Sequence, residues 1–322
     1  MPRASRLIES RAVEVAASMR EAYRAAWLAT ARGEPSADLW ARLAERFGQA
    51  VVVSTLLGVA NERRRLVRAG LVPVVREQPR IEKAPDVATF DDKPASLRLP
   101  KSFLDQLNVF RRDVPRLEER VNVLRWTAGN VARRMMERER GLVFDISARR
   151  VARVLVAPDG SESLRDVRGD IAADVLEELS GTPLDHRIVT ETRTVMAEAF
   201  NTGSMDTIRE NREVVPVTVL SEIHDRRTRG NPNGLYPEPH RHWQMDNFAA
   251  PSDDPVWRRI MPPNGWNCRA GVRGVSIAEA RRNGWVPKDG IEPDRQALRR
   301  QFAAQWRLIE SGQYPDPGFK SA

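Results

Sequence analysis

The apolar residues at the start of the chain recur with the period of an α-helix. They step by seven, four, three and four positions and so share one helical face; they are Ile8, Val15, Met19, Ala22 and Ala26. Gly33 and Pro35 end this pattern, and Ser36 stands where an N-cap residue would begin a second helix. The apolar residues of that second helix recur every four positions, at Leu39, Leu43 and Phe47. The pattern predicts a helical region over residues 1–71.

Residues 72–100 have no apolar period. Prolines interrupt a polar, charged stretch at positions 73, 79, 85, 94 and 100. Because proline lacks a backbone N–H and disfavours helix in the residue before it, this stretch is predicted to be a linker or an extended arm at a domain boundary. Such an arm can run along a partner instead of folding on itself.

Helical character resumes after Pro100. Ser102 and Asp105 form a capping-box pattern. A heptad-like stripe with spacings of three and four follows, formed by Val114, Leu117, Val121, Leu124, Ala128, Val131 and Met135. It has two interpretations: one long amphipathic helix packed on its neighbours, which we favour, or a contact with another subunit. The helical middle region is assigned to residues 101–181.

Two further helices are predicted around residue 182. A helical face ends before Gly181 and consists of Leu164, Val167, Ile171, Val175 and Leu179. Thr182, Pro183 and Asp185 then give the next helix a cap, a first-turn proline and an acidic third position. We expect that helix to stop at residues 201–203, where an Asn-Thr-Gly sequence stands.

The clearest strand signal is the β-branched stretch VVPVTVL at residues 214–220. Its Pro216 predicts an edge strand or a bulge, because proline cannot donate a hydrogen bond to a neighbouring strand. Loop-rich sequence follows over residues 224–266, with a turn at residues 231–234.

Two short helices complete the predicted elements. Ser276 and Glu279 cap the first, which ends at Gly284. The last helix is marked by Leu298, Phe302, Trp306 and Ile309. Together the elements predict an α+β protein: a mainly helical N-terminal part and a small, loop-rich α+β C-terminal domain at residues 182–322.

Composition sets broad limits on the class of protein. The chain has 322 residues, of which 41% are hydrophobic, which is enough for substantial cores. No run of about 18 apolar residues occurs, so we expect no membrane span, and the N-terminus lacks the apolar region of a secretory signal. A single cysteine, Cys268, allows no internal disulfide and fits a reducing compartment.

The net charge of +8 is compatible with contact to nucleic acid or to acidic protein surfaces. The basic residues are mostly arginines, and the pairs that some of them form are scattered along the chain, without a basic block. We therefore favour a solvated charged surface over dedicated nucleic-acid binding, and expect at most weak, non-specific contact with DNA.

The common catalytic motifs are missing from the sequence: it has no P-loop, no dinucleotide-binding glycine motif, no HExxH, no CxxC and no GxSxG. His240, His242 and Cys268 offer zinc-ligand types, but a closed structural zinc site needs a fourth ligand and no second cysteine exists. We expect no metal, no cofactor and no enzymatic activity.

Cys268 has a nucleophilic and a structural interpretation. The charge of Arg269 would lower the pKa of its thiol, and a histidine could activate it. Nothing else in the surrounding sequence, however, is typical of a catalytic cleft. A thiol that packs in a proline-rich turn is the interpretation that we favour.

An ordered series of polar residues stands in the last third of the chain. Arg187 and Glu191, four positions apart on one helix, are expected to pair. Buried Asp–Arg and Glu–Arg pairs could order the long loop region where the apolar core is small. The predicted polar network comprises Arg187, Glu191, Thr192, Asp225, Arg227, Thr228, Arg229, His240, Asn267, Cys268 and Arg269.

This series resembles the phage Mu F-like minor head proteins, also called phage head morphogenesis proteins. The resemblance rests on Arg-x-x-x-Glu-Thr from Arg187, on Asp-x-Arg-Thr-Arg from Asp225 after a strand, on His240, and on Asn-Cys-Arg from Asn267 after a proline-rich turn. It covers residues 183–275. The family commonly ends in Cys-Arg-Cys, whereas this chain has Ala270 at the last position, which favours the structural interpretation of Cys268.

The resemblance implies a virion component present in few copies, in the head interior or near the portal, that acts in head assembly and in DNA packaging or ejection. It would pass through the host cytoplasm during assembly. The portal protein is the first partner implied, followed by the major capsid or scaffolding protein, with no membrane. The alternative is a DNA-binding or metal-dependent nuclease-like module, although Asp225, His240 and His242 have no recognisable metal-ligand spacing.

Overall fold

The computed structural model describes residues 2–32, 34–71, 73, 99–156, 184–237, 240–266, 268–317 and 319. Its helices and strands, in chain order, are α1 (Pro2–Ala31), α2 (Ala37–Arg68), α3 (Lys101–Gln106), the 3-10 helix η1 (Leu107–Phe110), α4 (Leu117–Val156), α6 (Leu184–Glu210), β1 (Val217–Ser221), the 3-10 helix η2 (Trp243–Met245), β2 (Ala249–Pro251), α7 (Val256–Ile260), β3 (Gly271–Val275), α8 (Ile277–Arg282), α9 (Arg295–Gln301) and α10 (Ala303–Glu310). The predicted α+β class is confirmed. The helical face predicted over residues 164–179 and most of the proline-rich stretch lie outside the described residues.

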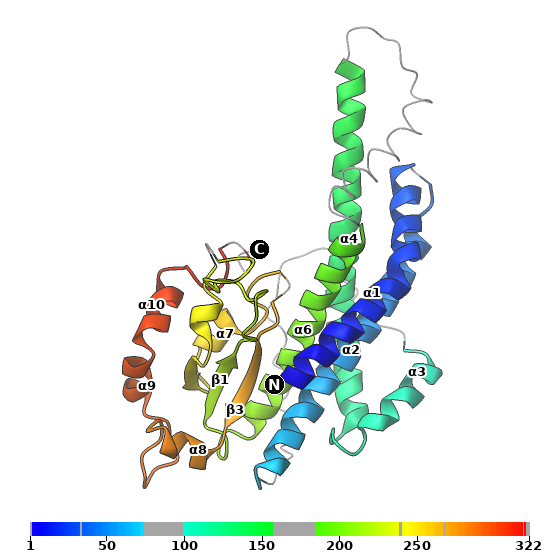
Figure 1. Cartoon of the computed structure of the whole chain (residues 1–322). Helices are drawn as coiled ribbons and strands as arrows, with labels where there is room; N and C mark the ends of the chain where they lie inside the picture. Colours follow the sequence, from blue (N-terminus) through cyan, green and yellow to red (C-terminus); the bar gives the residue numbers. More distant parts are fainter. Residues whose placement is uncertain are drawn as a thin grey trace.

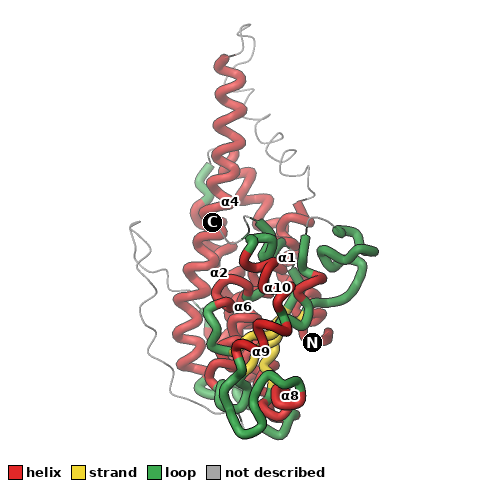
Figure 2. Tube along the Cα trace, turned by 90° about the vertical axis from the view of Figure 1, so that its left-hand side faces the viewer, coloured by secondary structure: helices red, strands yellow, loops and turns green. Residues whose placement is uncertain are grey.

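The long helices α1, α2, α4 and α6 pack around one apolar core (Figure 1). The heptad-like stripe contributes to it: Val114, Leu117, Val121 and Ala128 are all buried. The favoured interpretation of the stripe, a long helix packed on its neighbours, is therefore confirmed. Figure 2 shows α4 extending far beyond the other helices at one end of the molecule.

Two helix starts differ from the predicted capping. Ser36 is the N-cap residue of α2, but its side chain makes no capping hydrogen bond and instead accepts one from Thr30 Oγ1 at 3.0 Å. The predicted capping box of Ser102 and Asp105 is wrong, because α3 begins at Lys101 directly after Pro100, which places both residues inside the helix.

α2 and α6 cross with their backbones in close contact. A Cβ atom on Gly58 would lie 2.0 Å from the carbonyl oxygen of Phe200, and one on Gly203 would lie 2.1 Å from that of Thr55. Ser204 Oγ donates to the Gly58 carbonyl across the same crossing at 3.3 Å. Only glycine allows this approach at the two positions.

The helix that the sequence predicts to stop at residues 201–203 is α6, and this predicted end is wrong, since α6 continues to Glu210. Gly203 is a packing position inside the helix. Asn201 bonds both within the helix and to the sheet: its Nδ2 donates to the Ala197 and Ala270 carbonyls, and its Oδ1 accepts the Val272 N–H at 3.1 Å. Asn201 therefore joins α6 to the start of β3.

The three strands form an antiparallel sheet in the order β2-β1-β3. β1 is its central strand and pairs in continuous register from Val217, so the prediction from Pro216, an edge strand or a bulge, is wrong. The reason is that the strand begins at Val217, directly after the proline, whose missing N–H is not needed by the ladder. β2 and β3 were not predicted, because β2 has three residues and β3 contains two glycines.

A second apolar core lies around the sheet, between it, the C-terminal half of α6 and the short helices α7 to α10 (Figure 1). The predicted cap of α8 is confirmed, since Ser276 Oγ accepts the Glu279 N–H at 3.2 Å. The predicted last helix is instead two helices that meet at Phe302. α6 contributes to both cores. The predicted domain boundary at residue 182 lies outside the described residues and stays a prediction.

α2 is long and apolar enough to cross a membrane by length and composition alone, and 67% of its most apolar 18-residue window is buried inside the protein. A core helix of a globular protein meets the same criterion. The packing of α2 against α1, α4 and α6 accounts for its apolar composition.

The α2–α6 crossing generates a stability prediction. Gly203→Ala would push a Cβ into a backbone carbonyl that cannot rotate away, and we expect it to lower the free energy of unfolding by about 3 kcal/mol or more. The matched control is Gly141→Ala in α4, where a Cβ meets nothing within 4 Å and alanine should stabilise the helix by about 0.5–1 kcal/mol. Urea unfolding measures both. Equal effects of the two substitutions would contradict the close approach.

Candidate functional site

A cavity of about 720 Å³ opens between the helices α4 and α6 and the loops that flank β1 and β3. Its wall contains six residues of the predicted polar network: Glu191, Arg227, Thr228, Arg229, Cys268 and Arg269. Residues that are up to 78 positions apart in the sequence (191 to 269) thus share one site. The fold brings together most of what the sequence analysis singled out.

Asp225 and Arg269 form the predicted Asp–Arg pair with bidentate geometry. Arg269 Nη1 donates to Asp225 Oδ2 at 2.7 Å, and Nη2 donates to Oδ1 at 2.6 Å. The Arg227 N–H also donates to Oδ1, at 2.8 Å, which closes a tight turn around the carboxylate. The hydrogen bonds from Arg269 lower the pKa of Asp225 to about 2, against an opposing effect of burial. Unlike the predicted buried pair, however, the Asp225 side chain is 40% exposed.

Asp316 is the acceptor at the centre of a second group. Its Oδ1 lies 2.9 Å from His240 Nδ1 and 3.2 Å from His242 Nε2, and its Oδ2 accepts from Arg229. Gly265 makes room for this carboxylate, since a Cβ there would lie 2.2 Å from Oδ2. Burial alone would raise the pKa of Asp316, but the bonds to His242 and His240 and the charge of Arg229 lower it to about 2.

His242 lies deepest in the site, with a side chain that is 3% exposed. Asp316 stands at its Nε2 atom, and the edge of the Tyr314 ring packs against the imidazole at 5.4 Å between centroids. Burial alone would lower the pKa of His242, but its bonds to Asp316, Cys268 and Glu222 outweigh burial and raise the pKa well above its usual range.

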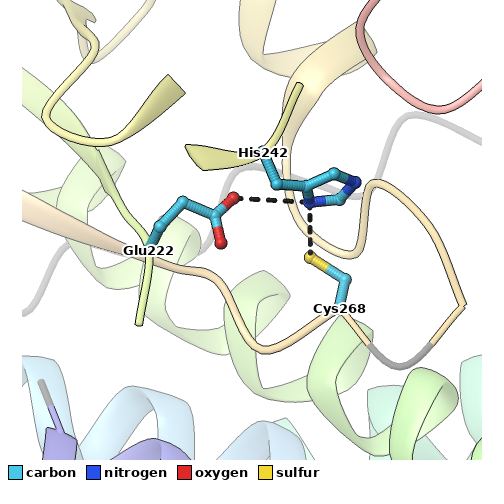
Figure 3. A group of neighbouring side chains, drawn as sticks. All are labelled: Glu222, His242 and Cys268. Atoms are coloured by element: carbon cyan, nitrogen blue, oxygen red, sulfur yellow. Dashed lines mark hydrogen bonds and ion pairs between the residues drawn. The ribbon is translucent and has the colours of Figure 1, made fainter. Parts of the chain in front are cut away.

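Glu222 and Cys268 both approach the other ring nitrogen of His242 (Figure 3). Oε1 of Glu222 lies 3.5 Å from Nδ1, and Sγ of Cys268 lies 3.8 Å from the same atom. Glu222 follows directly on β1, His242 precedes η2 and Cys268 precedes β3. The three side chains therefore reach one point from three separate segments, and N, O and S donors of this kind can hold a metal ion.

The two-histidine zinc arrangement considered from the sequence is not what the structure contains. His240 bonds to Asp316, and its ring centroid is 6.5 Å from that of His242, so only His242 reaches Cys268. Glu222 and Asp316 were missed. Glu222 could have been found as the first ionisable residue after the best predicted strand, whereas no pattern around Asp316 indicates that it returns to this site.

The remaining predicted residues are only partly described. The side chain of Arg187 and the whole of Asn267 lie outside the described residues, so the Arg187–Glu191 pair stays a prediction. Thr192 is fully buried on α6, and its hydroxyl has no hydrogen-bond partner among the residues that the structure describes.

Comparison with known proteins gives one partial relative. Over 86 residues the chain is 31% identical to a protein of Escherichia phage Mu named "Putative capsid assembly protein F". The match covers 27% of this chain and 17% of the phage Mu protein, so the chain spans far less than the full length of that relative. No protein-family model and no solved structure match the chain.

The match nevertheless agrees with the resemblance that the polar residues indicated. It links part of this chain to a protein named for capsid assembly, and so to phage heads in a general sense. The portal, DNA and copy-number roles that the resemblance implies go beyond this link.

The Asp225–Arg269 pair generates a prediction about acid stability. Asp225→Asn should lower the free energy of unfolding by about 1 kcal/mol near neutral pH, a modest value because solvent screens the half-exposed carboxylate. The folded-state pKa of about 2 lies below the unfolded value, so this contribution is complete above about pH 4 and is lost as the pH falls through about 2. Wild type and variant should therefore converge in stability on acidification.

Urea unfolding at several pH values provides the measurement. Asp253→Asn is the control, because Asp253 is also about half exposed and pairs with Arg295 through a single contact, and its loss should have little effect. A stability difference for Asp225→Asn that stays constant down to pH 2 would refute the assignment.

Proposed function

We propose that this chain is a minor head protein of a tailed phage or prophage that acts in head assembly through protein contacts and is not an enzyme. The match to the phage Mu capsid assembly protein carries this proposal. The shared cavity supports it, because six of the residues quoted for the resemblance line this one cavity. The finer proposal is that the chain binds the portal protein and lies in the head interior or near the portal.

The contact surface must lie outside the heptad-like stripe, whose residues are largely buried within the chain. Three large apolar side chains are exposed on consecutive elements nearby: Leu104 on α3 is 41% exposed, Val109 on η1 is 74% exposed, and Trp126 on α4 is 46% exposed. Exposed tryptophan and aliphatic side chains are common anchors of protein interfaces. We assign portal contact to the surface formed by α3, η1 and the first half of α4.

Val109→Asp combined with Trp126→Ala should weaken binding to the portal protein of the same phage or prophage by at least about tenfold, because a central tryptophan commonly contributes 2 kcal/mol or more to an interface. Co-sedimentation of the full chain with purified portal rings measures this effect. Ile291→Ala is the control, because Ile291 is 54% exposed but belongs to the loop between α8 and α9.

Two outcomes would count against these assignments. If the double variant sediments with portal rings as wild type does, the portal surface lies elsewhere. If the gene is deleted and the phage still assembles heads, packages DNA and ejects it normally, the head-assembly function is wrong.

DNA contact is expected to be weak and non-specific. Many arginines of the described part are paired with carboxylates, among them Arg120 with Glu210 and Arg273 with Glu279, which lowers their attraction to phosphates. If six phosphates are still contacted, affinity for duplex DNA should fall about a thousandfold between about 50 mM and 200 mM salt. Fluorescence anisotropy with two unrelated duplexes measures this dependence.

Portal binding should change less over the same salt range, because burial of apolar surface is insensitive to ionic screening. Tight, sequence-selective DNA binding at about 200 mM salt would favour the alternative function, a dedicated nucleic-acid protein.

A further inference from the structure

Glu222, His242 and Cys268 have the spacing of a metal coordination shell. Each offers one ligand atom, and the three atoms lie within 4.8 Å of one another. His242 Nδ1 is 3.5 Å from the Glu222 oxygen and 3.8 Å from the Cys268 sulfur, and Figure 3 shows both side chains pointing at this nitrogen. Around a tetrahedral zinc ion with ordinary bond lengths, neighbouring ligand atoms are about 3.4–3.6 Å apart. Both distances to Nδ1 are close to this separation.

Hydrogen bonding accounts for only part of the arrangement, because the Cys268 sulfur and the Glu222 oxygen approach the same nitrogen atom of His242. Nδ1 carries at most one hydrogen, and its 3.5 Å distance to Glu222 is longer than an ordinary N–H···O bond. The Glu222 side chain is 4% exposed, yet in the described part of the chain its Oε1 has only the long 3.5 Å contact to His242 and no ordinary hydrogen bond. A buried carboxylate oxygen in this state is costly. A cation placed among the three atoms would satisfy the oxygen, the nitrogen and the sulfur together.

The surroundings of His242 orient it for this role. The Nε2 side of the ring faces Asp316 Oδ1 at 3.2 Å, and Asp316 is itself held by Arg229 and His240. With the Nε2 hydrogen donated to this carboxylate, loss of the Nδ1 hydrogen to an incoming cation leaves the Nδ1 lone pair directed toward Glu222 and Cys268. Histidine ligands of metals typically have such a carboxylate partner on the other nitrogen.

We propose that Glu222, His242 and Cys268 bind a zinc ion whose fourth coordination position faces the arginine-lined cavity. One sulfur, one nitrogen and one oxygen donor favour zinc over magnesium or calcium, which prefer oxygen ligands alone. All three residues line the cavity, which gives the ion a path of entry and leaves room for a water molecule as the fourth ligand. The objection that the chain has no fourth protein ligand applies to closed structural sites and not to open ones.

Binding changes the protonation of the thiol. Cys268 enters the coordination shell as the thiolate and His242 as the neutral imidazole, so the thiol proton and the Nδ1 proton both pass to solvent as the zinc bonds form, and no electron is transferred. The site is independent of the proposed portal contact, because none of its residues belongs to α3, η1 or the first half of α4.

The test begins with the full chain purified without metal-chelating resin. After treatment with a chelator and addition of zinc chloride, elemental analysis should find close to one zinc per chain, and the thermal midpoint should rise because zinc binds only the folded state. Replacement of zinc by Co²⁺, whose d electrons make the site visible, should give a thiolate-to-metal absorption band that Cys268→Ser removes.

Three variants separate ligation from folding. Glu222→Gln keeps the size of the side chain but replaces the carboxylate by a weaker ligand, and it should lose stoichiometric zinc while remaining folded by circular dichroism. Asp316→Asn, which changes a positioning residue, should weaken zinc about 10- to 100-fold. His224→Gln is the control, because His224 is 44% exposed, pairs with Asp246 and does not line the cavity, so zinc should be unchanged.

Specific results would overturn the proposal. The proposal is wrong if the folded, reduced wild-type chain contains no zinc after dialysis against micromolar zinc. A cobalt band that survives Cys268→Ser would also overturn it. Rapid alkylation of Cys268 by iodoacetamide that zinc does not slow would identify the pair with His242 as a nucleophilic thiol instead.

Discussion

The close contact between the backbones of α2 and α6 is the constraint on which the rest of the structure depends. With glycine at positions 58 and 203 the two helices approach until each nearly touches the other's carbonyl groups. α6 is thereby fixed against the helical core at its N-terminal half and extends into the sheet core at its C-terminal half. One helix thus sets the position of the sheet relative to the bundle. The cavity lies between these two parts, with Thr190, Glu191 and Arg193 of α6 in its wall.

Polar bonds then fix the sheet onto the paired helices. Asn201 of α6 binds the backbone of β3, and the fully buried Glu62 of α2 accepts the Gly274 N–H at 3.1 Å while pairing with Arg65. Each of these groups would be costly to bury without its partner. β3 leads back along the chain to Cys268, so the same bonds that hold the strand also hold the thiol opposite His242.

Some local signals predicted local structure correctly. The cap of α8 depends on Ser276 and Glu279 alone, and the long helices depend on apolar period, so each could be derived from neighbouring residues. Several errors occurred where a residue matches a local sequence signal but takes part in a contact between distant parts of the chain. Asn201 and Gly203 match a helix stop, yet they serve the sheet and the helix crossing, and Pro216 matches an edge strand, yet it precedes the central one. Asp316 shows what sequence patterns cannot predict, because only the folded chain brings it to His240 and His242.

Most of the described residues that carry the family resemblance are scattered in sequence but lie close together in space, which gives the resemblance a physical basis. Arg269 donates hydrogen bonds to Asp225, 44 positions away in the sequence, and Arg229 and His240 both bond to the carboxylate of Asp316. The alanine at position 270 does not break this unit, because Glu222 and His242 stand beside Cys268 without a second cysteine. A small three-stranded sheet buries little apolar surface for so many loops. A cation at Glu222, His242 and Cys268 would tie together the segments that follow β1, precede η2 and precede β3, and so would supply by coordination the rigidity that the sheet alone does not.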